Sequence, residues 1–512
     1  MPKTKHLSAR RQQAVARPGS APIMIALDRR TRVPLQRQIY ICIRDAILGG
    51  RLAPGTRLPA SRTLADDLGV SRTTVVLAYE SLLTQGYITG RGSAGSFVAS
   101  LRTEQPETRI TARAVRTPRD TDIERKTGRA LALTTAASGM PNVRAAPVPF
   151  RTGEPALDLF PVRLWARMYA RRARHSGGAL LGYGLDAGHR PLRVAIAAYV
   201  SAARGARATP EQVILVRGTQ QGVHLAARVL LEPGDVAWIE DPGYTAARTL
   251  LVTTGASVAP VAVDAEGLIV ADGIRRAPRA RVAYVSPSHQ FPLGATMSLA
   301  RRLALLEWAA SVGAWILEDD YDSEFRYAGA PIPSLQGLDS HDRVIYLGTF
   351  SKTMFPALRL GYLIVPPSLV DVFRATQQLA DRIAPSIEQA TLAEFIDDGH
   401  FTRHVRQMRT AYAERQDALL RGVRRELDGL VDATPAGTGM HLVTWLRDPT
   451  RDAARISARA RERGVEAAPL SMYQIEAALP PGLLLGFAAT RPADMGAGLR
   501  TLRQAIESAA SR

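Results

Sequence analysis

Short apolar runs alternate with helical stretches from about Phe150 onward. Six of these runs are bounded by polar turns and are rich in β-branched or aromatic residues, which predicts buried strands. They are residues 213–216, 236–239, 282–285, 315–317, 344–347 and 362–365. The alternation predicts an α/β domain with a largely parallel sheet, whose ligands bind at the carboxyl ends of the strands.

The first hundred residues follow a different pattern. Apolar residues recur at helical spacing over residues 35–47, and a glycine pair ends this first predicted helix. Ser61 is expected to cap a short second helix, and Ser71 a longer third helix that runs to about Gln85. Two short strands around a glycine-rich tip are expected over residues 87–98. This order predicts a helix-turn-helix followed by a wing.

The third helix begins with polar residues that would reach the major groove, and several arginines fall where a winged helix meets phosphates or base edges. The predicted DNA-binding residues are Arg57, Arg62, Ser71, Arg72, Thr73, Thr74 and Arg91. A three-helix bundle with a structural role is the competing interpretation. The run LPASRTLADDLGVSRTTV and the later GYI and GSFV segments resemble the GntR family of winged-helix repressors, which favours DNA binding.

The chain is strongly basic, with a formal net charge of +19 over 512 residues and a pI near 10.6. No Asp or Glu precedes Asp28, so residues 1–27 form a basic tail that suits a polyanion and is expected to be disordered. A solvated terminus without a partner is the alternative. Residues 100–147 have almost no periodic apolar positions and predict a linker. Domains are therefore expected at 28–99 and 148–512.

The one cysteine, Cys42, excludes an internal disulfide and a thiolate metal cluster, and we expect no metal site. No apolar run reaches the length of a membrane span, and the amino terminus lacks the apolar segment of a signal peptide. A cytoplasmic protein without a membrane partner is expected.

The segment GTFSKTMFPALRLGY, residues 348–362, places one lysine between two apolar strands. A buried, unpartnered charge is costly, and a pocket that lowers the pKa of Lys352 suits a Schiff base with pyridoxal 5'-phosphate (PLP). Thr349, Ser351 and Arg359 offer the hydroxyl and guanidinium donors that a phosphate dianion needs. An ordinary surface Ser-Lys pair is the alternative, which the apolar flanks disfavour.

Three more polar clusters follow predicted strands. The first begins a helix whose amides suit phosphate, the second offers a ring that can stack on a flat heterocycle, and the third supplies a carboxylate for a pyridine nitrogen. In that order they are Gly218, Thr219 and Gln220; Tyr244; and Asp319, Asp320 and Tyr321.

Together these clusters and the lysine segment resemble the fold type I aminotransferases over about residues 150–506. The implied roles are Schiff-base formation for Lys352, a contact to the pyridine nitrogen for Asp319, a position near the ring hydroxyl for Tyr321 and stacking on the ring for Tyr244. The implied phosphate ligands are Gly218, Thr219, Gln220, Thr349, Ser351 and Arg359. The resemblance also implies a smaller α+β subdomain at the carboxy terminus. Tyr183 would reach the cofactor of a neighbouring subunit, which implies a homodimer.

Three features depart from the aminotransferase pattern, and the first two concern the cofactor ring. Asp319 and Tyr321 are two residues apart where many of these enzymes space the roles by three, so Asp320 remains an alternative carboxylate. Residues 289–294 read HQFPLG where the family often has Asn-Pro-x-Gly. This leaves open the hydrogen bond that the loop usually gives to the ring hydroxyl.

A winged helix joined to an aminotransferase-like domain resembles the MocR subfamily of GntR regulators. This implies a PLP-dependent transcriptional regulator that binds double-stranded DNA and senses PLP or a small amino compound. The alternatives are a working aminotransferase with an incidental amino-terminal domain and an architectural nucleic-acid binder. The arginine that usually holds a substrate carboxylate has no evident counterpart in residues 483–487, although Arg491 is close, and this favours a regulator with at most slow half-reactions.

Overall fold

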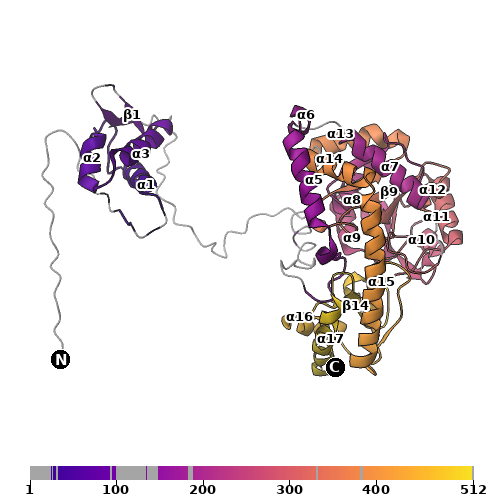
Figure 1. The fold of residues 1–512 in the computed structure, drawn as a ribbon. Helices are drawn as coiled ribbons and strands as arrows, with labels where there is room; N and C mark the ends of the chain where they lie inside the picture. Colours follow the sequence, from indigo (N-terminus) through magenta and orange to yellow (C-terminus); the bar gives the residue numbers. More distant parts are fainter. Residues whose placement is uncertain are drawn as a thin grey trace, which may run out of the picture. The chain divides into compact units, whose positions relative to one another are not determined.

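The computed structural model describes residues 25, 27–29, 31, 33–90, 92, 95–99, 134, 148–182, 188–329, 333–380 and 385–509. The chain divides into two compact units, Met1–Ile123 and Glu124–Arg512, and each is described by itself. Nearly all of the predicted tail and linker lies outside the described residues, as do Arg91 and Tyr183. Figure 1 shows both units along the chain.

The amino-terminal unit is a helix-turn-helix with a wing, as predicted. Its elements are α1 (Leu35–Leu48), α2 (Ser61–Leu68), α3 (Arg72–Thr84), β1 (Ile88–Gly90) and β2 (Ser96–Val98). The two strands pair antiparallel. Apolar faces of the three helices meet in one core that includes Ile43, Leu64, Val75 and Leu82. Gly69 ends α2 in the left-handed region at φ +60°, a conformation that glycine adopts without steric cost.

The starts of α2 and α3 differ in how their backbone amides are satisfied. Ser71 precedes α3, and its Oγ accepts a hydrogen bond from the Thr74 amide at 3.2 Å, which confirms the predicted cap. The prediction that Ser61 caps α2 is wrong. The helix starts at Ser61 itself after Ala60, and no side chain caps it. A serine already inside the first turn is no longer at the N-cap position, from which an oxygen reaches the free amides.

The larger unit is built on an eight-stranded sheet in the order β3-β10-β9-β8-β7-β4-β5-β6. Its strands are β3 (Val213–Val216), β4 (Val236–Asp241), β5 (Ser257–Asp264), β6 (Gly267–Leu268), β7 (Val282–Val285), β8 (Trp315–Asp320), β9 (Val344–Thr349) and β10 (Gly361–Ile364). The run from β9 to β5 is parallel, whereas β10 pairs antiparallel with β3 and β9. The six predicted strands and the largely parallel sheet are confirmed, and β5 and β6 are additions.

Helices cover both faces of this sheet. They are α5 (Val162–His175), α6 (Gly178–Leu181), α7 (Arg190–Arg204), α8 (Thr219–Leu230), α9 (Thr245–Thr253), α10 (Val270–Arg276), α11 (Leu299–Val312), α12 (Leu335–Leu338), α13 (Val370–Ala380) and α14 (Ser386–Asp397). Leu215 of β3 packs in one core with Ile196 of α7, while its neighbour Val216 packs in another with Val223 of α8. Successive residues of a strand point to opposite faces, so both sets are buried.

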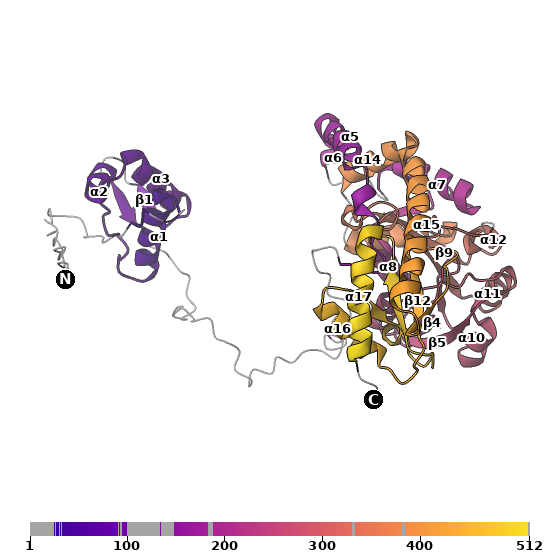
Figure 2. The ribbon, with the colours of Figure 1, turned by 60° about the horizontal axis from the view of Figure 1, so that its bottom comes forward.

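A smaller carboxy-terminal subdomain completes the unit, as predicted. Its elements are α15 (His400–Glu426), β11 (Val431–Ala433), β12 (His441–Leu446), α16 (Ala453–Glu462), β13 (Ala468–Pro469), β14 (Gly482–Gly486) and α17 (Pro492–Ser508). Its four strands are antiparallel in the order β11-β12-β14-β13. Figure 2 shows the long helix α15 beside α17. Short 3-10 turns lie at Leu157–Leu159, Pro356–Leu358, Pro367–Leu369 and Leu470–Tyr473.

The segment before α5 lies directly on β14. The Gly486 amide donates to the Phe150 carbonyl at 2.8 Å, and a Cβ on Gly486 would come within 2.1 Å of the Arg151 carbonyl oxygen. This close approach requires glycine. It joins segments that are more than three hundred residues apart in the sequence.

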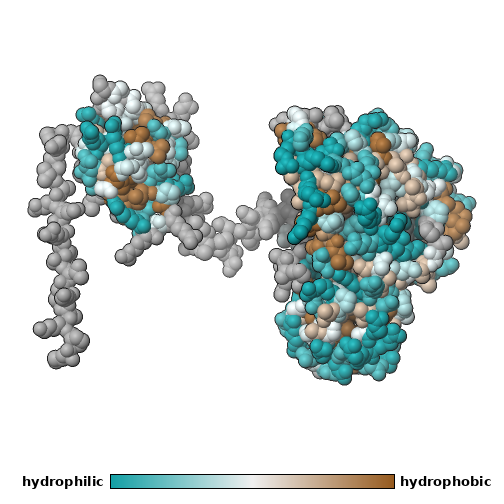
Figure 3. Space-filling model, in the orientation of Figure 1, coloured by the Kyte–Doolittle hydropathy of each residue, from teal (hydrophilic) through white to brown (hydrophobic). Residues whose placement is uncertain are grey.

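The surface of the larger unit is mainly hydrophilic, as expected when most apolar residues are buried in its cores. On the face shown in Figure 3, hydrophilic residues predominate over the larger unit, and hydrophobic residues form small groups among them. Within the described residues, no helix is both long and apolar enough to cross a membrane.

The two serines at the starts of α2 and α3 give a matched test of the capping geometry. We expect Ser71→Ala to lower the free energy of opening of α3 by about 1 kcal/mol, because it leaves the Thr74 amide without its side-chain acceptor. Ser61→Ala should change the free energy of opening of α2 by no more than a few tenths of about 1 kcal/mol, because Ser61 does not cap this helix. Hydrogen exchange of the helix amides in the full-length protein measures both, and equal effects would contradict the assigned caps.

Candidate cofactor site

A cavity of about 510 Å³ lies at the carboxyl ends of β3, β8 and β9. This size is typical of small-molecule sites. It is lined by every described residue of the predicted cofactor set: Gly218, Thr219, Gln220, Tyr244, Asp319, Tyr321, Thr349, Ser351, Lys352 and Arg359. Tyr183, the remaining member, lies outside the described residues.

Lys352 follows β9 and points its amine at the segment that lies on β14. Its Nζ donates a hydrogen bond to the Gly153 carbonyl at 2.6 Å. Burial lowers the pKa of Lys352 below the ordinary value of a lysine, although the carboxylates of Asp322, Asp319 and Glu154 act in the opposite direction. A lower pKa increases the fraction of neutral amine, which is the form that attacks a carbonyl carbon. In the sequence, Lys352 is the only lysine after Lys126.

Phosphate-binding groups gather at one end of the cavity. Gly218, the N-cap of α8, adopts φ +95°, which glycine allows and which leaves the first amides of the helix free of a side chain. Thr349 Oγ1 accepts a hydrogen bond from the Ser351 amide at 3.2 Å. Arg359 lies in the left-handed region at φ +51°, an uncommon conformation for a non-glycine residue. Such strain is typical of functional sites.

The choice between Asp319 and Asp320 follows from strand geometry. Consecutive residues of β8 point to opposite faces, and Asp319 faces the cavity. Asp320 points away and is occupied, since it pairs with Arg204 at 3.0 Å and accepts from the Tyr346 hydroxyl at 2.6 Å. The alternative carboxylate of the sequence analysis is therefore not in the cavity.

Asp319 itself carries an unused acceptor. The Tyr284 hydroxyl donates to its Oδ2, while its buried Oδ1 has no hydrogen-bond partner among the described residues. Burial raises the pKa of Asp319 to about 7, against the opposing effect of the Tyr284 hydrogen bond. A buried oxygen without a partner is costly unless a ligand donates to it.

The loop of residues 289–294, which reads HQFPLG, begins with the buried His289. His289 Nδ1 contacts both oxygens of Asp322, at 2.9 and 3.1 Å, and lies 3.0 Å from the Tyr321 hydroxyl. Gln290 points elsewhere and donates to the Pro242 carbonyl at 2.8 Å. Tyr321, the residue expected near the ring hydroxyl, is thus in contact with His289 of this loop.

Three buried side chains around this loop could in principle suit a metal ion: His289, Asp322 and His441. Their hydrogen bonds already occupy several of the ligand atoms, since Asp322 binds His289 and His441 Nε2 lies 3.0 Å from the Pro292 carbonyl. Burial lowers the pKa of His441 to about 3, so its ring is neutral. Within the cluster, a hydrogen bond joins His289 to Asp322, and the ring centroids of His289 and His441 are 5.1 Å apart.

The lining of the cavity also contains two members of an ion-pair cluster, Arg151 and Glu466. Arg151 Nε donates to Glu466 at 3.0 Å, and its Nη1 lies 3.6 Å from Glu154. The arginine expected on the last strand is not there: residues 483–485 are leucines, each 0% exposed. Arg491 does not replace it, because its side chain is 65% exposed and pairs with Asp494.

Arg151, Glu154 and Glu466 were not among the predicted site residues. They come from distant segments of the chain. Arg151 and Glu466 are separated by 315 positions, and neither lies in a recognisable motif. Asp322 could have been found, because it follows the acidic end of β8 directly. Other cavity residues that were missed are Phe291, Met440, His441, Met472 and Tyr473.

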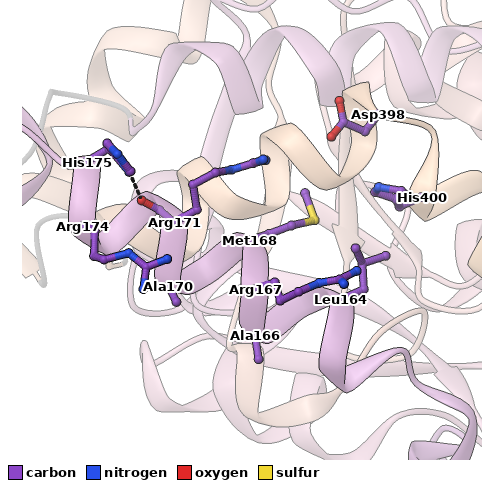
Figure 4. Close-up of a pocket in the computed structure, with 10 residues that line it drawn as sticks. All are labelled: Leu164, Ala166, Arg167, Met168, Ala170, Arg171, Arg174, His175, Asp398 and His400. Carbon is purple, nitrogen blue, oxygen red and sulfur yellow. Dashed lines mark hydrogen bonds between the residues drawn. The ribbon is translucent and has the colours of Figure 1, made fainter.

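A second cavity, of about 770 Å³, lies over α5 and is lined by Leu164, Arg167, Met168, Arg171, Arg174, Asp398 and His400, among others. Figure 4 shows its arginines along one helix, with His175 Nδ1 against the Arg171 carbonyl. None of the predicted cofactor residues lines it. It also lacks a lysine, so the smaller cavity is the better candidate for carbonyl chemistry.

In the winged unit, five predicted DNA-binding residues are exposed: Arg57, Arg62, Ser71, Arg72 and Thr73. Ser71 and Thr74 are engaged with each other, their hydroxyl oxygens 2.8 Å apart, and Ser71 also caps α3. Because the cap uses these two hydroxyls, Arg72 and Thr73 are the better placed of this group to contact bases.

Comparison with known proteins agrees with both halves of the chain. Residues 35–98 match the family of bacterial regulatory proteins of the gntR type, and residues 147–499 match aminotransferase class I and II. The chain is 40% identical to the probable rhizopine catabolism regulatory protein MocR of Rhizobium meliloti, over 94% of this chain and 96% of that protein. The protein belongs to the MocR-type subfamily of GntR transcriptional regulators.

This MocR-type regulator is also similar to another transcriptional regulator and to an aminotransferase of known structure. It is 30% identical to the pyridoxine biosynthesis transcriptional regulator PdxR of Corynebacterium glutamicum, over 91% of this chain and 95% of PdxR. The kynurenine aminotransferase of Pyrococcus horikoshii resembles it with a TM-score of 0.65 and 25% identity, over 76% of this chain and 97% of the enzyme. The larger unit of this regulator therefore has the fold type I aminotransferase fold.

The two aspartates of β8 should respond in opposite ways to amide substitution. Asp320→Asn weakens the ion pair with the buried Arg204 and should destabilise the cofactor-free protein by about 3 kcal/mol at pH 7. For Asp319, the folded pKa of about 7 lies above the ordinary value of 3.8, so the stability it contributes is lost as pH rises between these values.

Asp319→Asn removes that pH dependence. Relative to the wild type, this variant should gain stability between about pH 4 and pH 7, by up to about 4 kcal/mol. Urea unfolding of both variants across this range is the measurement. A loss of stability in Asp319→Asn that grows with pH would contradict the assignment.

Proposed function

We propose that this regulator binds PLP in the cavity at the carboxyl ends of β3, β8 and β9 and that the bound cofactor controls DNA binding. The observation that supports this most directly is Lys352, a buried amine with a lowered pKa and the only lysine after residue 126. It shares one cavity with Arg359 and the amino terminus of α8. An aldehyde and a phosphate are the two groups that such a set can bind together.

The residues present fit the cofactor group by group. Arg359, Thr349, Ser351 and the α8 amides would hold its phosphate, and the free Oδ1 of Asp319 would accept a hydrogen bond from its protonated pyridine nitrogen. PLP, when bound, supplies an aldehyde carbon that condenses with a primary amine. Tyr244 would pack on the ring, and Tyr321, held by His289, would lie near its hydroxyl.

The remaining parts of the proposal concern how the regulator acts on DNA. A cofactor or an amino compound can change DNA binding only if it favours one arrangement of the protein over another. We further propose that the protein acts as a homodimer on a double-stranded operator, read by Arg72 and Thr73. No described residue supplies the carboxylate-binding arginine on β14, which favours a regulator over a working aminotransferase.

The decisive experiment combines covalent trapping with DNA binding. Purified protein with PLP should show an absorption band of the bound cofactor, and borohydride reduction should attach the cofactor to Lys352, as peptide mass spectrometry can show. Lys352→Ala should lose the trapped product, whereas Lys126→Ala should keep it. In the same preparations, PLP should change binding to the DNA upstream of the protein's own coding sequence at least fivefold for the wild type and not for Lys352→Ala.

Two results would count against this. A trapped cofactor in Lys352→Ala would refute the site. Sustained conversion of amino donors to keto acids at about 1 per second or faster, with DNA binding indifferent to PLP, would favour the enzyme.

Base recognition by α3 can be tested separately. Arg72→Ala should reduce the difference in binding free energy between the operator and single-base mismatches, a difference that is normally about 1–3 kcal/mol per base pair. Arg44→Ala removes an equal charge from α1 and should leave that difference unchanged, although it can weaken binding to all sequences. Fluorescence anisotropy at fixed salt measures both. An unchanged mismatch penalty in Arg72→Ala would exclude a base contact by this residue.

A further inference from the structure

The wall of the cavity beyond Lys352 is unusual in its charge. One guanidinium, that of Arg151, is shared by two carboxylates, with Glu466 at 3.0 Å and Glu154 at 3.6 Å. All three side chains are largely buried, with exposed fractions of 11%, 18% and 21%. The cluster therefore carries one positive and two negative charges in surroundings where charges interact strongly.

The backbone fixes this cluster beside the reactive amine. The Glu466 amide donates to the Pro149 carbonyl at 3.0 Å, and the Gly486 amide donates to the Phe150 carbonyl at 2.8 Å. Two positions after Arg151, the Gly153 carbonyl accepts a hydrogen bond from Lys352 Nζ. Arg151 lines the same cavity as Lys352 and is two residues from Gly153, so a ligand at the position of the Lys352 amine can extend toward it.

A ligand carboxylate is poorly matched to this wall. It would have to displace Glu466 from Arg151 or lie against two carboxylates, and like charges repel at these distances. A hydroxyl or amino group can instead donate to Glu466, which lines the cavity, without breaking the existing ion pair. The other lining side chains here, Phe291, Met472 and Tyr473, offer apolar surface to a carbon skeleton.

We propose that the effector of this regulator is a primary amine that carries hydroxyl or further amino groups and no carboxylate, and that Glu466 sets this preference by occupying Arg151. The inference rests on the proposed PLP site. The ligand nitrogen bonds to the cofactor carbon, the bond from that carbon to Lys352 breaks, and Lys352 takes up the proton that the ligand amine gives up. The exchange balances without an oxidant or a reductant.

Matched pairs of ligands test the preference with the PLP-loaded, full-length protein. The pairs are 4-aminobutan-1-ol with 4-aminobutanoate and 3-aminopropan-1-ol with 3-aminopropanoate. We expect the alcohol of each pair to half-saturate the cofactor absorbance change at a concentration at least tenfold lower than the acid. The shift in melting temperature at equal ligand concentration gives a second readout that does not depend on the cofactor spectrum.

Glu466→Gln keeps the shape of the side chain and frees the charge of Arg151. It should reduce the tenfold preference to less than threefold by improving binding of the acids. Asp432→Asn, which removes one partner of an exposed ion pair with Arg447, is the control and should keep the preference. If Glu466→Gln folds poorly, Glu154→Gln tests the same charge balance.

Each outcome separates this inference from the proposed function. If the acids bind as well as the alcohols, or if neither glutamate variant changes the ratio, the inference is refuted while PLP binding stands. It is also refuted if borohydride traps the cofactor on Lys352 but no amine of either kind alters the spectrum or the melting temperature. If no cofactor is trapped on Lys352, the proposed function fails and the inference fails with it.

Discussion

The burial of one amine between β9 and β10 is the constraint on which the cofactor site depends. A lysine in the interior must be neutral, paired or covalently used, because a buried ammonium without partners is strongly disfavoured. Lys352 meets this demand through the Gly153 carbonyl and through carboxylates that oppose the effect of burial on its pKa. The segment that carries Gly153 must therefore lie close by, and Gly486 of β14 provides the room for it. The lysine thus links the large sheet to the carboxy-terminal subdomain.

Strand β8 shows how one short acidic run serves three purposes. Its last three residues alternate between the faces of the sheet. Glu318 accepts hydrogen bonds from two amides at the start of α12, and Asp320 pairs with Arg204, so both stabilise the fold. Asp319, between them, faces the cavity with one oxygen unused. A proposed functional carboxylate is in this way held between two structural ones, which fixes its direction.

Charge is used differently in the two units. In the winged unit, the three described arginines of the predicted DNA-binding set are exposed, as a polyanion partner requires. In the larger unit, two buried arginines are paired with carboxylates: Arg204 with Asp320, and Arg151 with Glu466. The high net charge of the chain therefore gives little information about its ligand cavity, where the local balance is negative at one wall and positive at the phosphate end.

The sequence by itself determined the fold of both units and located the predicted cofactor residues that line the cavity. Apolar periodicity located the six central strands and the three helices of the reader, and the short motifs around Gly218, Asp319 and Lys352 each lie within a few consecutive residues. Local patterns of this kind survive folding because one strand end or one helix start carries the whole set. Three matters were decided by tertiary structure alone. Strand pairing turned Asp320 away from the cavity, the fold brought Arg151 to Glu466 across 315 positions, and Arg491 is exposed and paired with Asp494 rather than placed in the cavity. Contacts between distant segments leave no spacing in a single sequence, because only the packing of the folded chain brings those residues together.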